Sequence, residues 1–100
     1  MPTNPAEFHE EAAAEYDAAF GWYLDRSPDA ALKFDAEVDR ALAQIIQAPQ
    51  RWAVGPFSTR RFLLRQFPFI LIYRERASAD IQIVAVAHTS RKPGYWKQRL

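Results

Sequence analysis

The spacing of apolar residues predicts two consecutive helices in the first half of the chain. Over residues 10–26, apolar side chains recur three and four positions apart, which places them on one face of a helix. These positions are Tyr16, Ala19, Phe20, Tyr23 and Leu24. Gly21 lies inside this segment, and we interpret it as a point where a neighbouring element comes close. The pattern repeats and predicts a second helix with an apolar face of Ala31, Phe34, Val38, Leu42 and Ile45.

Local signals set the ends of these helices. Ser27 is a capping residue, Pro28 suits the first position of a helix, and Asp29 complements the positive end of the helix dipole. Pro49 ends the second helix, because a residue that precedes proline is pushed out of the helical conformation. The short link at residues 26–28 predicts an antiparallel helix hairpin.

After residue 59 the period of the pattern changes to two. Segments 60–67, 69–75 and 81–88 alternate or are rich in β-branched and aromatic residues, which predicts three strands. Residues 77–80 predict a hairpin turn, and residues 6–9 a weak strand at the sheet edge. The expected fold is therefore α+β, with an N-terminal antiparallel helix hairpin packed on a small, mainly antiparallel β-sheet.

Size and composition narrow the possibilities. The 100 residues suit a single domain over 1–100, and 49% hydrophobic with 25% charged residues is typical of a folded protein. The chain has no cysteine, and no carboxylate spacing near its two histidines suggests a metal site, so we expect neither metal nor cofactor. No apolar run is long enough to cross a bilayer and no secretory signal is visible. We therefore expect a cytoplasmic protein without membrane contact.

The charges are unevenly distributed along the chain. Residues 1–50 carry three Lys/Arg and ten Asp/Glu (3 − 10 = −7), and residues 51–100 carry ten Lys/Arg and two Asp/Glu (10 − 2 = +8). The acidic N-terminal half and the basic C-terminal half have two explanations: either the C-terminal half binds an anionic partner, or the two halves neutralise each other in the fold. Four acidic residues are interpreted as a solvated helix start: Glu7, Glu10, Glu11 and Glu15.

Basic and aromatic side chains follow the strands and fill the last residues. RNA cleavage without a metal needs groups that take and give a proton and cations that stabilise the phosphate. One set has the residue types for this chemistry: Arg61, Arg65, His88, Arg91 and Tyr95. A second set is expected to bind an anionic partner: Arg60, Lys92, Trp96, Lys97 and Arg99. The alternative for His88 is a hydrogen-bonded structural role at the end of its strand.

Three stretches, RRFLLRQFPFILIY, IQIVAVAH and TSRKPGYWKQR, together with the helix pattern before them, resemble the RelE/ParE toxin family, which includes plasmid-stabilisation proteins. The resemblance covers about residues 6 to 99. It implies the α+β fold described above and the role of toxin in a type II toxin–antitoxin pair, neutralised by a cognate antitoxin protein.

The family resemblance implies more than one possible activity. ParE-like members act on DNA gyrase, whereas RelE-like members are endoribonucleases that cut mRNA on the ribosome. The middle of this chain has no lysine, and the best-known RNase members carry a lysine cluster there. The preferred prediction is therefore a ParE-like, gyrase-directed toxin. The alternatives are a RelE-like, metal-independent RNase and a non-toxic member that only binds its partner.

Overall fold

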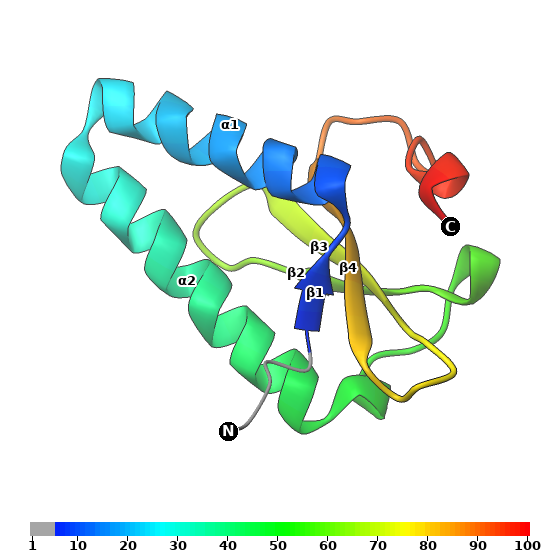
Figure 1. Cartoon of the computed structure of the whole chain (residues 1–100). Coiled ribbons are helices and arrows are strands. Elements are labelled where there is room, and N and C mark those ends of the chain that lie inside the picture. The colour runs from blue at the N-terminus through cyan, green and yellow to red at the C-terminus, as the bar shows by residue number, and fades with distance from the viewer. Residues whose placement is uncertain (1–5) are drawn as a thin grey trace.

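The computed structural model describes residues 6–100, which form two helices on one face of a four-stranded sheet (Figure 1). The strands are β1 (Ala6–Phe8), β2 (Arg60–Leu63), β3 (Phe69–Glu75) and β4 (Ile81–His88), and the helices are α1 (Glu10–Arg26) and α2 (Pro28–Gln47). Single 3-10 turns lie at Pro49–Arg51, Pro56–Ser58 and Lys97–Arg99. The predicted α+β class and helix hairpin are confirmed.

The hairpin forms where the local signals predicted it. The Ser27 hydroxyl accepts a hydrogen bond from the Ala30 N–H at 3.2 Å, and Pro28 is the first residue of α2. At the start of α1, His9 caps the helix by accepting the Glu11 N–H through Nδ1 at 3.0 Å. Both helix starts therefore satisfy N–H groups that have no partner within the helix.

The sheet has the strand order β1-β4-β3-β2. β2–β3 and β3–β4 pair antiparallel, and the short β1 pairs parallel with β4. Ile72 pairs with Ala85 while Tyr73 pairs with Ile83, so Val84 is an extra residue that forms a β-bulge. The bulge turns Val84 and Ala85 toward the face of the sheet opposite the helices, where both are buried.

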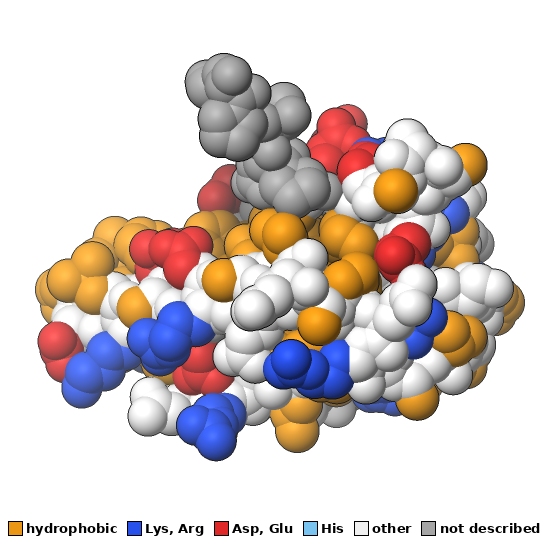
Figure 2. Space-filling model, turned by 90° about the horizontal axis from the view of Figure 1, so that it is seen from below, with side chains coloured by type: hydrophobic (Ala, Val, Ile, Leu, Met, Phe, Trp, Pro, Cys, Tyr) orange, Lys and Arg blue, Asp and Glu red, His pale blue; other side chains and the backbone are white. Residues whose placement is uncertain are grey.

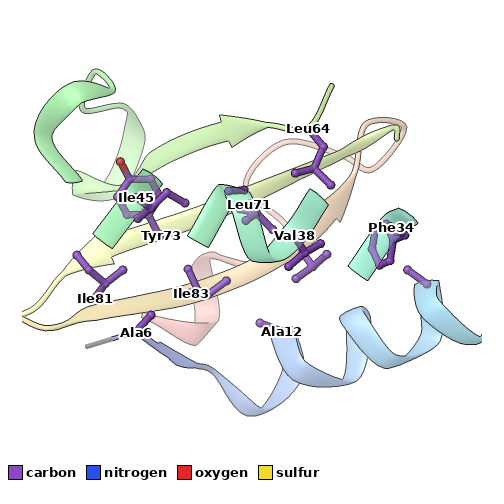
Figure 3. Close-up of a cluster of buried hydrophobic side chains, with 13 residues drawn as sticks. Ala6, Ala12, Phe34, Val38, Ile45, Leu64, Leu71, Tyr73, Ile81 and Ile83 are labelled. Atoms are coloured by element: carbon purple, nitrogen blue, oxygen red, sulfur yellow. The ribbon is translucent and has the colours of Figure 1, made fainter. Parts of the chain in front are cut away.

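The main core lies between the helix hairpin and the sheet. Leu71, Tyr73 and Ile83 from the sheet pack with Val38 and Ile45 from α2, and all are at most 2% exposed (Figure 3). Aromatic rings extend the core along the hairpin, and the Phe34 ring contacts four of them: Tyr16, Tyr23, Phe67 and Phe69. The hairpin is thus fixed to the sheet along its length.

Three sequence-based expectations need correction. β2 ends at Leu63 rather than at residue 67, because the buried Glu37 carboxylate of α2 accepts the backbone N–H groups of Arg65 and Gln66 and draws the chain away from the sheet. Leu24 is 45% exposed, since at helical spacing it lies about 80° around the helix from Tyr16. Gly21 has no neighbour within 4 Å of where a Cβ would lie, so no element approaches it.

Charges of both signs occur together on the surface. The face seen from below in Figure 1 carries red and blue side chains with orange apolar ones between them (Figure 2). Part of the charge of the two halves is neutralised in the fold, since Arg76 pairs with Glu7 at 2.5 Å and Arg99 with Glu15 at 2.8 Å. Arg76 and Arg99 are therefore engaged in contacts within the fold.

Candidate functional site

The end of the chain folds back onto the sheet face that the helices leave open. The Trp96 ring is 6% exposed and packs with Ile72, Val84, Ala85 and Ala87. Trp96 was predicted to contact a partner, and in this conformation its side chain instead anchors the tail. Lys97 lies one residue further on, in the final turn, with an exposed side chain.

The tail is also attached to α1 through a half-buried carboxylate. Glu15 accepts hydrogen bonds from the Val86 N–H at 2.9 Å, from the Tyr95 hydroxyl at 2.7 Å and from the Arg99 guanidinium at 2.8 and 2.9 Å. Arg99 also donates to the Val84 carbonyl at 3.0 Å, and its side chain is only 9% exposed. We call Glu15, Tyr95 and Arg99 the tail clasp.

The electrostatics of the tail clasp keep Glu15 ionised. Burial raises the pKa of Glu15, but hydrogen bonds from Arg99, Tyr95 and Val86 outweigh burial, so the pKa lies below its usual 4.5. Burial and the hydrogen bond to Glu15 raise the pKa of the Tyr95 phenol to about 12. Glu15 was interpreted as part of a solvated helix start, which is wrong. It lies on the sheet-facing side of α1, three residues after Ala12 and four before Ala19, both buried.

His88 lies exposed at the end of β4. Its Nδ1 accepts the Ser90 N–H at 3.0 Å and lies 2.8 Å from the Ser90 hydroxyl, and its ring meets the edge of Phe69 at 5.2 Å between centroids. Because Nδ1 is an acceptor, the neutral ring carries its proton on Nε2. Nε2 then has no lone pair with which to take a proton.

Four of the five predicted catalytic residues line one hollow of about 230 Å³: Arg61, His88, Arg91 and Tyr95. We call it the basic hollow. Lys92, from the second set, lines it as well. The Arg91 guanidinium lies over the Tyr95 ring at 3.8 Å from the centroid. Within residues 6–100, Arg61, Arg91 and Lys92 make no ion pair.

The remaining predicted residues lie elsewhere. Arg65 lines a different hollow, formed with Glu37 and Arg40 of α2. Arg60 donates a hydrogen bond to the Trp52 carbonyl on the helix side of β2. The predicted catalytic set is therefore divided between two places.

A second surface was not anticipated from the sequence. An apolar groove of about 460 Å³ runs between α1 and the ends of β3 and β4, and it is lined mainly by Ala18, Ala19, Trp22, Tyr23, Pro68 and Phe69. Trp22 is 53% exposed, with the Arg26 guanidinium 3.6 Å from its ring centroid. The sequence signal was present, since Ala18 and Trp22 form a second, narrower apolar line on α1.

Two kinds of site find no support in the described residues. Among residues 6–100, no three His, Cys, Asp or Glu side chains gather as metal ligands would. Within the same range, neither helix has the length and the apolar character needed to span a bilayer.

These features define a small α+β protein: a helix hairpin on one face of a four-stranded sheet, and a basic tail clasped to the other. The model of the family described as ParE toxin of type II toxin–antitoxin system, parDE, matches residues 6–93. The chain belongs to this family.

A solved structure supports the same fold. The structure titled "Chromosomal ParDE TA system from P. aeruginosa" aligns with a TM-score of 0.71, covering 83% of this chain and 92% of that one at 24% sequence identity. No curated protein matches the sequence at a significant level.

Proposed function

We propose that this protein is a growth-inhibiting toxin that acts in the cytoplasm by binding DNA gyrase and is neutralised by a cognate antitoxin. Membership of the ParE toxin family supports the toxin role and implies the antitoxin partner. The fold alone does not distinguish gyrase binding from RNA cleavage, so the choice depends on the site.

The observation that favours binding over cleavage is that the groups needed for proton transfer are engaged elsewhere. The Tyr95 hydroxyl donates to Glu15, and the His88 Nδ1 lone pair accepts the Ser90 N–H. Arg65, one of the cations expected to stabilise the phosphate, lines the other hollow. A general base must present a lone pair within reach of the proton that it removes. The basic hollow offers cations and apolar surface without such a base.

The antitoxin is expected to occupy the apolar groove beside α1. A groove lined by Trp22, Tyr23 and Phe69 suits the apolar face of an amphipathic helix, or of a segment that folds on binding. His88 and Arg91 line both the groove and the basic hollow. An antitoxin in the groove would therefore also reach the edge of the hollow.

The RNase alternative retains one argument, since Arg61, His88 and Arg91 share a hollow in which they can hold a phosphate. The two functions are separated by inducing the wild type, His88→Gln and Arg65→Ala without antitoxin in a bacterium, and pulse-labelling DNA and protein synthesis. We expect DNA synthesis to fall first with all three chains. An early fall in protein synthesis that both substitutions abolish would establish the RNase, and no growth defect from the wild type would indicate a non-toxic member.

A further inference from the structure

The turn before β2 presents an exposed aromatic side chain on a strained backbone. Phe57 and Ser58 have φ of 61° and 59°, in the left-handed region that L-residues other than Asn and Asp rarely adopt. Phe57 is 55% exposed, and its neighbour Val54 is 57% exposed. Strain of this kind persists only where the surrounding structure enforces it, and it is concentrated at functional sites.

Several contacts enforce the conformation of this turn. The Gly55 N–H donates to the Thr59 carbonyl at 2.7 Å, and the Thr59 hydroxyl donates to the Pro56 carbonyl at 2.8 Å. The Phe57 ring meets the buried Trp96 ring edge-on, with 6.0 Å between the ring centroids. Gly94 has a φ of 80°, and a Cβ at this residue would lie 4.0 Å from the Phe57 ring. The tail and the turn thus hold Phe57 at the rim of the basic hollow.

The rim carries cations that make no ion pair with a carboxylate. Arg61, Arg91 and Lys92 line the hollow and make no ion pair within the described part of the chain, and no Asp or Glu is among the lining residues. A carboxylate-free cluster of cations beside an exposed aromatic ring is complementary to a surface that is acidic and apolar.

The apolar part of the lining favours a protein over a nucleic acid as the ligand of the hollow. Ile70, Ile72 and Ala87 line it and offer no side-chain hydrogen bond. A nucleobase inserted there would lose the hydrogen bonds of its polar edge, whereas an aliphatic or aromatic side chain would lose none. An apolar side chain flanked by carboxylates therefore fits best.

We propose that the Phe57 turn and the basic hollow form the surface on which the toxin's protein target docks, through an acidic patch that inserts one bulky apolar side chain beside Phe57. This inference rests on the proposed function, because it assumes a protein target. The hollow is already formed in the free chain, which suits a folded target, whereas an antitoxin tail that folds on binding suits the larger groove beside α1, of about 460 Å³ against about 230 Å³.

The test compares two variants in the surface with two matched controls. Phe57→Ala removes the exposed ring, and Lys92→Glu reverses a rim charge. The controls are Leu32→Ala, a substitution of an apolar side chain that is 65% exposed on α2, and Arg40→Glu, which reverses an exposed charge on α2. Each chain is assayed for thermal unfolding, for toxicity on induction, for binding to purified gyrase and for capture by the cognate antitoxin.

We expect Lys92→Glu to unfold at the wild-type temperature and Phe57→Ala slightly below it, because its ring no longer packs against Trp96. Both variants should remain folded, bind gyrase roughly 30-fold more weakly, as after loss of an interface hot spot, and lose toxicity. Antitoxin capture and both controls should match the wild type. Full toxicity in both surface variants would overturn the proposal, as would loss of antitoxin capture with toxicity intact. So would binding of a fluorescent single-stranded oligonucleotide that Lys92→Glu abolishes.

The two proposals fail in different ways. If the wild type does not bind gyrase, the gyrase assignment is wrong. The docking surface is then tested by whether Phe57→Ala and Lys92→Glu are less toxic than the wild type. If the wild type binds gyrase and both surface variants bind equally well, the docking surface is wrong and the gyrase assignment stands.

Discussion

Replacing Glu15 by Gln should release the tail from α1 without changing the shape of the side chain. Glu15 is 18% exposed and Arg99 9% exposed, so their attraction is only partly screened by water. Glutamine retains one oxygen that can accept the Val86 N–H or the Tyr95 hydroxyl, but it lacks the charge that pairs with Arg99. Hydrogen bonds to charged groups contribute about 1.5–3 kcal/mol each, and a buried cation left unpaired costs more.

We therefore expect Glu15→Gln to lower the free energy of unfolding by about 2 kcal/mol and the midpoint of thermal unfolding by roughly 10 °C for a domain of this size. Urea unfolding followed by circular dichroism gives the free energy, and calorimetry gives the midpoint. Loosening of the tail should also expose the Trp96 ring, which tryptophan fluorescence detects in the folded variant.

Glu11 provides the matched control, because its carboxylate lies 3.8 Å from the same Arg99 guanidinium but is 65% exposed. Glu11→Gln should change the free energy of unfolding by less than about 0.5 kcal/mol, as for a surface ion pair. In a double-mutant cycle, Glu15→Gln and Arg99→Met should show a coupling of about 1 kcal/mol or more. Equal effects of the Glu11 and Glu15 substitutions, or no coupling, would refute the tail clasp.

Further predictions concern pH, helix propensity and the groove. The pKa of every tyrosine is raised in the folded chain, mainly by burial, and that of Tyr95 to about 12. Stability should therefore fall as the pH rises above 10, and ultraviolet titration should show tyrosinate at a higher pH in the folded protein than in the protein unfolded by urea. Absorbance of one ionised tyrosine at pH 10 in the folded protein would contradict this. Gly21→Ala should stabilise by about 0.5–1 kcal/mol because a Cβ there meets nothing, whereas Gly94→Ala, at a φ of 80°, should destabilise, both measured by urea unfolding. Trp22→Glu should leave toxicity intact and weaken antitoxin capture more than about tenfold in a titration. Unchanged capture would show that the antitoxin does not bind in the groove.

Acid should weaken the tail clasp as well, through Glu15. The pKa of Glu15 is lowered in the folded chain, so the stabilisation it provides is complete above its ordinary value of 4.5 and is lost as the pH falls through the lower folded value. Glu15→Gln should therefore lose less stability than the wild type on acidification below pH 4.5. Parallel stability curves for the two chains in that range would contradict the lowered pKa.

Helix and strand bounds were predictable where neighbouring residues determine them. Ser27 and Pro28 start α2 through contacts made within a few residues, and the apolar run Ile81–His88 is a strand whichever elements cover it. The end of β2 was not predictable, because it depends on the Glu37 carboxylate, 28 residues away in sequence.

The candidate site was only partly predictable for the same reason. The residue types grouped Arg61, Arg65, His88, Arg91 and Tyr95, and all of them but Arg65 line one hollow. Nothing local distinguished Glu15 from the exposed carboxylates beside it. Its partner Arg99 lies 84 residues further along the chain. The left-handed backbone of Phe57 was not predictable from its neighbours, because it is contrary to the preference of a bulky residue and arises only from the packed turn.

The most direct test of the central claim is DNA supercoiling by purified gyrase in the presence of the purified toxin, with and without antitoxin. We predict that the wild type and His88→Gln inhibit supercoiling to the same extent and that antitoxin reverses the inhibition. Normal supercoiling at every toxin concentration, together with cleavage of mRNA on ribosomes that His88→Gln abolishes, would contradict the account and establish an RNase instead.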